Sequence, residues 1–244
     1  MKRNQINRLK MRKQMLALTA LLLTGVVWGA AAQTWNEWRD PEVNAVNRLP
    51  MRSSFEAGER LSLDGIWRFM WVRDASDRPE GIWRTDYDDR AWGTMPVPGI
   101  WEVNGYGDPI YVNVGYAWRG NFQSDPPLIP DAENHVGSYR REFDVPESWT
   151  GKQITLSIGS ATSNVYVWVN GRFVGYSEDS KLAAQFDVTK YVHPGRNLIA
   201  MQGFRWLDGP YLVEQDLWRL AGLARRVGAR GGHRGPPVAV RRAP

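Results

Sequence analysis

Short apolar or alternating segments, separated by turns rich in Gly, Pro and Asn, follow one another through most of the chain from Leu61 onward. The clearest pair is Asn164–Val169 and Arg172–Tyr176, joined by Asn170-Gly171, a dipeptide that strongly favours a two-residue hairpin. No segment keeps a helical period for more than about two turns. The pattern therefore predicts an all-β fold, a sandwich of antiparallel sheets. The other predicted strands are Ile66–Val72, Ser138–Val145, Gln153–Ile158, Gln185–Val188 and Asn197–Trp206.

Three segments lack a clear strand pattern. Gln33–Arg60 is polar and irregular, and we interpret it as an extended arm in front of the domain. Met95–Trp101 contains two prolines, which cannot donate to a sheet, so we expect it at a sheet edge or in a loop. Gly105–Pro130 is rich in Gly, Pro, Asn and Tyr, and a loop of that length inside a compact domain is usually functional.

The first 32 residues have the organisation of a secretory signal peptide. A basic start is followed by the apolar run Met15–Val27 and by the small residues Ala30–Ala32. We expect cleavage after Ala32 and an exported, periplasmic or extracellular protein; the alternative is an uncleaved membrane anchor, for which the apolar run is short. No other segment is expected to span a membrane.

The charge is divided unevenly along the chain. Six Lys/Arg lie in the first 13 residues and six Arg in residues 224–244, which leaves 19 basic against 26 acidic residues between them, a net charge of about −7. This acidic body argues against a nucleic-acid partner. Cysteine is absent, so disulfides and cysteine-ligated metals are excluded, and the three His are scattered. The 13 Trp fit either sugar-stacking surfaces or a Trp-rich core.

Residues 224–244 are predicted to be disordered, since they consist almost entirely of Gly, Arg, Pro, Ala and Val and contain no acid. An Arg/Gly-rich nucleic-acid arm is one interpretation, and an out-of-frame end is the one that we favour for an exported protein.

Several motifs resemble the N-terminal sugar-binding domain of glycoside hydrolase family 2, specifically that of the bacterial β-galactosidases. The resemblance covers roughly residues 36–222, in order and with natural spacing. It rests on LDGIW (Leu63–Trp67), GYGDPIYVNVGYAW (Gly105–Trp118), NHVGSYRREFDVP (Asn134–Pro146), VYVWVNGRFVGYSEDS (Val165–Ser180) and RWLDGPYLVEQDLWRLAG (Arg205–Gly222).

The resemblance implies a jelly-roll sandwich of the galactose-binding-like type over residues 61–223. It also implies that Asn113 and Val114 contact galactose and that Asp208 binds a galactose hydroxyl and a sodium ion. An amide offers donors and an acceptor to sugar hydroxyls, and a carboxylate is a strong acceptor and a hard ligand. Without the resemblance, Asn113 is simply a loop-capping residue and Asp208 a turn residue before Gly209.

In the family, a separate barrel carries the two catalytic Glu residues of a retaining hydrolase. Magnesium belongs to that barrel, and the full-length parent is expected to be a homo-oligomer. This chain is therefore expected to be a truncated β-galactosidase, inactive alone and without catalytic residues of its own.

The sequence departs from the family pattern at Leu207 and Pro210, beside Asp208, and again after Gly222, where the family continues with a sheet-closing strand. We expect that strand to be lost here, leaving an exposed and aggregation-prone sheet edge. Glu214 and Asp216 form a carboxylate pair, as do Glu178 and Asp179, but we expect neither pair to be catalytic. Two alternatives remain, a free-standing carbohydrate-binding module and a family 2 sibling such as a β-glucuronidase.

Overall fold

The computed structural model describes residues 35–51, 58–112, 128–209 and 217–232. The chain divides into two compact units, Met1–Asn36 and Glu37–Pro244, and the second unit holds the two sheets. The predicted signal peptide, residues 1–32, lies outside the described residues. Within the described part of the chain, no helix has the length and apolar character needed to cross a membrane.

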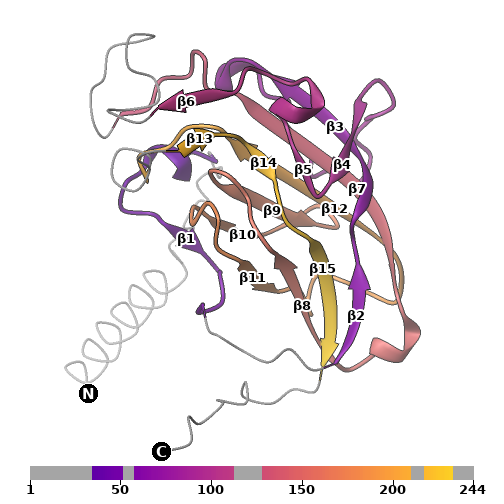
Figure 1. Cartoon of the computed structure of the whole chain (residues 1–244). Helices are drawn as coiled ribbons and strands as arrows, with labels where there is room; N and C mark the ends of the chain where they lie inside the picture. The colour runs from indigo at the N-terminus through magenta and orange to yellow at the C-terminus, as the bar shows by residue number, and fades with distance from the viewer. Residues whose placement is uncertain (1–34, 52–57, 113–127, 210–216, 233–244) are drawn as a thin grey trace, which may run out of the picture. The chain divides into compact units, whose positions relative to one another are not determined.

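Two antiparallel sheets form the domain, as the strand pattern predicted (Figure 1). The larger sheet has seven strands in the order β1-β10-β9-β12-β7-β3-β4, and the smaller has four in the order β11-β8-β15-β2. In the larger sheet these are β1 (Ala45–Val46), β10 (Arg172–Ser177), β9 (Val165–Val169), β12 (Gly195–Phe204), β7 (Val136–Val145), β3 (Gly65–Val72) and β4 (Gly93–Val97). In the smaller sheet they are β11 (Ala184–Asp187), β8 (Gln153–Ile158), β15 (Val227–Gly232) and β2 (Glu59–Ser62).

Two short ribbons and four 3-10 turns complete the described fold. One ribbon pairs β6 with β13, and the other pairs β5 with β14. Their bounds are β5 (Gly99–Ile100), β6 (Ile110–Val112), β13 (Leu217–Arg219) and β14 (Gly222–Leu223), and the turns are η1 (Glu37–Arg39), η2 (Ala75–Asp77), η3 (Glu102–Asn104) and η4 (Glu147–Trp149). β6 lies inside the long segment for which no strand was predicted.

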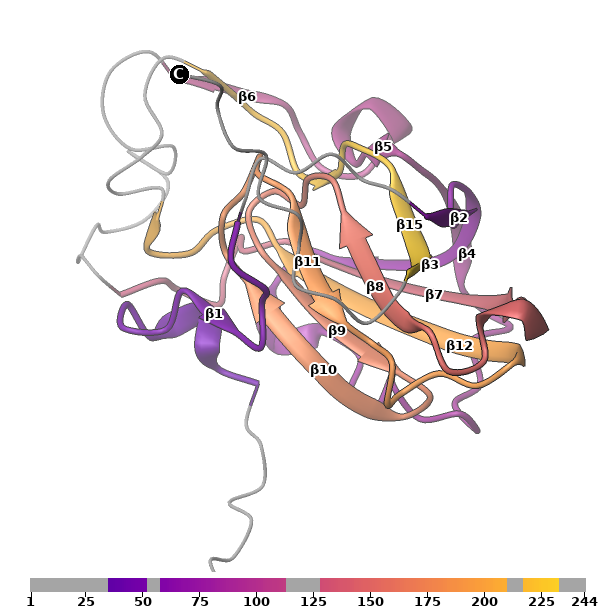
Figure 2. The same ribbon diagram turned by 90° about the horizontal axis from the view of Figure 1, so that it is seen from below.

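The hydrophobic core lies between the two sheets, which Figure 2 shows as separate layers. β8 buries every second residue, namely Ile154, Leu156 and Ile158, because alternate side chains of a strand point to one face. The seven-stranded sheet contributes Trp67 and Phe69 to the same core. Each such side chain contributes about 1.5–3 kcal/mol through burial. The prediction of an all-β jelly-roll sandwich is confirmed.

Aromatic side chains also pack on the outer face of the seven-stranded sheet. Trp38 stacks on Phe204 at a centroid distance of 4.7 Å, and Trp83 stacks on Trp168 at 5.4 Å. Trp38 lies in η1, before β2, and Trp83 lies in the segment after β3. Segments outside the sheet therefore cover part of this face. Most of the described tryptophans are therefore packing residues, whereas Trp218 is 56% exposed.

The predicted hairpin is confirmed in its strands and in its turn. β9 and β10 pair antiparallel, with Arg172 opposite Val169. Asn170 and Gly171 both have positive φ, 50° and 79°, as a two-residue hairpin of this kind requires. The proline-containing segment also lies where expected, because β4 is an edge strand of the seven-stranded sheet.

The prediction that the chain is disordered from Ala224 onward is wrong for residues 227–232. These residues form β15, which pairs with β8 on one side and β2 on the other. Val227 and Ala229 point into the core, and the backbone N–H of Leu63 donates to the carbonyl of Val227 at 2.9 Å. The sheet edge that we expected to be open is therefore filled by the strand that we expected to be lost. Residues 233–244 lie outside the described residues.

Candidate functional site

Asp208 lies four residues beyond the end of β12 and is only 9% exposed. Its Oδ1 atom is buried without a hydrogen-bond partner among the described residues. A buried carboxylate oxygen without a donor carries an uncompensated desolvation cost, which a ligand hydroxyl or a cation would relieve. Of the three predicted sugar-contacting residues, Asp208 is the one that the structure describes; Asn113 and Val114 lie outside the described residues.

The backbone before Asp208 is fixed by side chains from distant segments. Asn134 exchanges two hydrogen bonds with the main chain of Trp206, donating to its carbonyl at 3.1 Å and accepting from its N–H at 2.9 Å. The hydroxyl of Ser163 donates to the carbonyl of Arg205 at 2.7 Å. Asp208 therefore follows a rigid segment, although it comes after the end of a strand.

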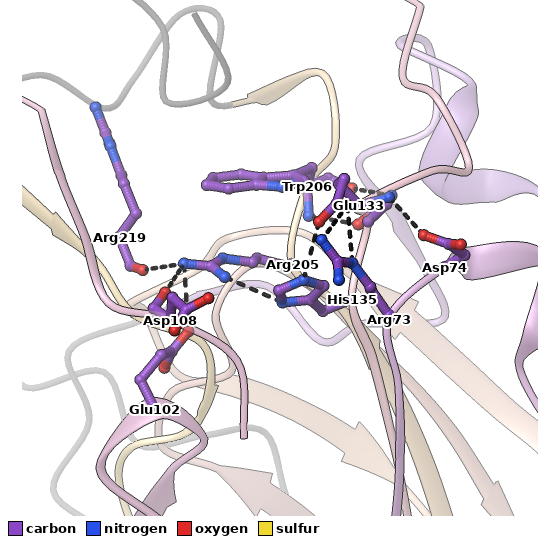
Figure 3. A network of polar contacts seen from close by, with 10 residues as sticks. Arg73, Asp74, Glu102, Asp108, Glu133, His135, Arg205, Trp206 and Arg219 are labelled. Atoms are coloured by element: carbon purple, nitrogen blue, oxygen red, sulfur yellow. Dashed lines mark hydrogen bonds and ion pairs between the residues drawn. The ribbon is translucent and has the colours of Figure 1, made fainter. Parts of the chain in front are cut away.

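Arg205 is the centre of a buried polar network beneath this segment (Figure 3). Its guanidinium donates to the carbonyl oxygens of Asp108 at 2.7 Å and Arg219 at 3.0 Å, and to Nδ1 of His135 at 3.0 Å. Asp108 precedes β6, and Arg219 ends β13. One guanidinium thus ties the end of β12 to the two-stranded ribbon that leads towards Asn113.

Glu102 supplies the countercharge of Arg205. Its carboxylate lies 3.6 Å from the guanidinium, and both side chains are almost completely buried. The same carboxylate accepts from the backbone N–H of Ala221 at 3.0 Å. Burial raises the pKa of Glu102, and the hydrogen bond from Ala221 and the charge of Arg205 oppose that rise. Glu102 therefore joins β14 to the same network.

His135 is neutral in this network. Burial, assisted by the adjacent Arg205 charge, lowers the pKa of His135 to about 4. Because a guanidinium can only donate, Nδ1 of His135 accepts and its proton lies on Nε2. The ring also packs edge-on against Trp71 at 4.8 Å. The histidine has the contacts of a structural residue.

Glu178 adds a second carboxyl group close to Asp208. Burial raises the pKa of Glu178 to about 8, and the negative charges of Asp208 and Asp40 add to the rise. The hydroxyl of Tyr176 donates to Glu178 at 2.6 Å. At neutral pH Glu178 therefore keeps its proton and can donate a hydrogen bond, while the unpartnered Oδ1 of Asp208 can accept one from a hydroxyl group.

Among the described residues, no group of three His, Cys, Asp or Glu side chains is arranged to hold a metal ion. Glu214, Asp216 and Pro210 lie outside the described residues, so the structure gives no geometry for that carboxylate pair. Leu207, where the sequence departs from the family pattern, is buried.

The sequence did not predict that Glu178 lies close to Asp208, or that Glu102 and His135 contact Arg205. Glu178 lies in a motif that carried the resemblance, but part of the rise in its pKa comes from the charges of Asp208 and Asp40, which are distant in sequence. For Glu102 and His135 the sequence offers only isolated residues, because both meet Arg205 through the fold.

Comparison with known proteins identifies the family of this domain. A family model described as "Glycosyl hydrolases family 2, sugar binding domain" matches residues 61–229. A β-galactosidase of Halalkalibacterium halodurans is 38% identical over 202 residues, which cover 78% of this chain and 20% of that protein. A β-galactosidase of Priestia megaterium is 36% identical over 214 residues, covering 81% of this chain and 21% of that protein. The chain thus spans about one fifth of the length of these relatives.

Solved structures share the fold at low sequence identity. A Bacteroides uniformis β-glucuronidase 2 superimposes with a TM-score of 0.55 at 18% identity, covering 72% of this chain and 18% of that one. A Bifidobacterium dentium β-glucuronidase superimposes with a TM-score of 0.52 at 20% identity, covering 76% of this chain and 31% of that one. At such identities the likeness supports the sandwich fold and says nothing of the substrate.

Proposed function

The chain belongs to glycosyl hydrolase family 2 through its sugar-binding domain, and we propose that it serves a β-galactosidase that hydrolyses terminal non-reducing β-D-galactose. The observation that carries this proposal is the buried, unpartnered carboxylate oxygen of Asp208 in a chain 38% identical to a β-galactosidase. The domain would supply part of the sugar-binding surface, and catalysis would come from two Glu residues on a barrel that these 244 residues do not include.

In this proposal Asp208 accepts a hydrogen bond from a galactose hydroxyl, with Asn113 and Val114 beside it. Glu178, protonated at neutral pH, adds a hydrogen-bond donor beside Asp208. The Arg205 network holds the approach to Asp208 in place. The substrate partner is a β-galactoside, the protein is exported, and the whole enzyme is a homo-oligomer without a nucleic-acid partner.

A sodium ion fits the donor chemistry of Asp208. Its unpartnered Oδ1 is a hard oxygen ligand in a buried position, which suits a hard cation. When bound, the ion would neutralise the carboxylate and orient a sugar hydroxyl. Asp208 would supply a charged oxygen ligand to the ion. Magnesium would belong to the barrel.

A domain exchange tests the proposal. Residues 61–232 replace the corresponding segment of the Halalkalibacterium halodurans β-galactosidase, and the chimera is assayed with nitrophenyl β-D-galactoside and β-D-glucuronide. We expect galactosidase activity, and an Asp208→Asn substitution should lower kcat/KM by about tenfold to a hundredfold. Asp144→Asn, an exposed substitution on β7, is the matched control. A folded chimera without galactosidase activity, or one insensitive to Asp208→Asn, would contradict the proposal.

A free-standing carbohydrate-binding module is the second candidate function. It predicts that the 244-residue chain binds galactose measurably by titration calorimetry, whereas our proposal predicts little or no binding because only part of the site is present. Our proposal also predicts that the pure chain does not hydrolyse a chromogenic galactoside, and turnover would refute that part of it.

A further inference from the structure

A polar groove of about 620 Å³ lies on the outer face of the seven-stranded sheet, and the loop between β3 and β4 forms part of its wall. Arg196, near the start of β12, is part of its lining, whereas Asp208 follows the other end of that strand. A volume of this size is typical of small-molecule sites. Most of its lining side chains are charged or polar, which disfavours an apolar ligand.

Two arginines face each other across neighbouring strands in the groove. Arg68 on β3 is directly opposite Arg140 on β7. Like charges in such a pair are destabilising. Arg140 is compensated, because its Nε donates to Asp89 at 2.8 Å and its terminal nitrogens donate to loop carbonyls. Arg68 is exposed, and its guanidinium donates one long hydrogen bond, 3.4 Å, to the carbonyl of Trp92.

The groove therefore has more positive than negative charge. The side chains of Arg68, Arg140 and Arg196 face Asp89 and Glu142 in the groove, an excess of one positive charge in a chain whose body is acidic, whereas the guanidinium of Arg141 lies over Trp67 on the other face of β7. Asp89 and Glu142 are already paired with Arg140 and Arg196. Arg141 is held by the carbonyl oxygens of Leu63 and Asp64. The guanidinium of Arg68 is the group best placed to receive an anion.

We propose that this groove binds a sugar acid, with the ligand carboxylate on Arg68. A guanidinium binds a carboxylate through two parallel hydrogen bonds, which a neutral sugar cannot form. The outer oxygens of Glu142 and Asp89 accept from ligand hydroxyls, so the acidic residues of the groove favour a hydroxylated anion over a simple one. A uronate as a free monosaccharide and a uronate within a polysaccharide carry the same recognition chemistry.

Titration calorimetry of the purified protein tests the inference with D-galacturonate, tri-galacturonate, D-galactose and sulfate. We expect galacturonate to bind, galactose and sulfate to bind more weakly, and the affinity for galacturonate to fall as salt is added. Tighter binding of the trimer would identify a polysaccharide as the source, and equal binding would identify the free sugar acid. Arg68→Gln should weaken galacturonate binding at least about tenfold, since a hydrogen bond to a charged group is commonly worth that much.

Arg225→Gln is the matched control, because Arg225 is an exposed arginine in the turn before β15 and does not line the groove. It should leave the affinity for galacturonate unchanged. The inference is overturned if galacturonate does not bind, if sulfate binds as tightly, or if Arg68→Gln and Arg225→Gln have the same effect. None of these outcomes depends on Asp208, so the inference can fail while the proposed function stands.

Discussion

Gly231 and Gly232 are neighbours at the end of β15, yet an added methyl group would meet very different surroundings. A Cβ on Gly231 would lie 2.6 Å from the ring of Trp149, whereas a Cβ on Gly232 would have no atom within 4 Å. Trp149 cannot move aside easily, because it is 2% exposed and its indole N–H donates to Glu59 at 2.6 Å. Gly231→Ala should therefore destabilise the domain, and Gly232→Ala should not.

The size of the effect follows from overpacking of a buried site. Forcing an extra methyl group into a packed core typically costs about 1–3 kcal/mol. For a domain of this size each kcal/mol lowers the melting temperature by roughly 2–4 °C, so Gly231→Ala should melt roughly 2–12 °C below the unsubstituted chain. Gly232→Ala should melt at the temperature of the unsubstituted chain or slightly above it. Alanine lowers the conformational entropy of the unfolded chain, which stabilises the fold by about 0.4–1 kcal/mol.

Thermal unfolding followed by tryptophan fluorescence measures both variants in the same buffer. Equal melting temperatures for Gly231→Ala and Gly232→Ala would show that β15 does not pack on Trp149. The sequence-based expectation of a disordered tail predicts that equality, so the pair of variants decides between the tail and the strand.

Two further predictions concern buried charges near Asp208. Because the folded-state pKa of Glu178 is raised from 4.5 to about 8, the folded chain holds a proton that the unfolded chain has released between these values, and stability should fall by up to about 1.4 kcal/mol per pH unit as the pH rises from about 5 to 8. Urea unfolding should show this slope in the unsubstituted chain and not in Glu178→Gln. Arg205→Met should lower the free energy of unfolding by about 3–5 kcal/mol, because it leaves Glu102 buried without its cation. In the same variant, nuclear magnetic resonance titration should show the pKa of His135 rising from about 4, since Arg205 helps to depress it.

Each of these predictions has its own control. Asp144→Asn removes an exposed carboxyl and should leave the pH slope intact; a slope that persists in Glu178→Gln would mean that another group causes it. Glu102→Gln keeps an acceptor for Ala221 and should cost less than Arg205→Met. An unchanged His135 pKa in a folded Arg205→Met variant would show that the two side chains are not in contact.

Local signals made much of the fold predictable. Asn170-Gly171 specifies its hairpin within a few residues, and the alternation in Gln153–Ile158 specifies a half-buried strand. β15 was missed because Gly and Ala, which make up most of it, are depleted in strands and because its pairing with β2 and β8 is non-local. The signal that could have found it is the alternation of Val227 and Ala229, which share the buried face.

The candidate site was predictable only where a motif carried it. Asp208 stood in a recognisable motif, whereas the role of Arg205 depends on carbonyl oxygens and on a histidine from three other segments. A motif can identify a functional residue. The burial and the hydrogen-bond partners of that residue arise from tertiary contacts, which no local pattern encodes.

The position of β15 in the smaller sheet also sets an order of assembly. β2 is synthesised near the start of the domain, yet among the described residues its sheet partner is β15, which is synthesised after all the other described strands. Until then β2 is unpaired and β8 presents an open edge, and closing so long a loop is slow. The nascent domain therefore keeps an open, aggregation-prone edge on β8 until β15 has been synthesised.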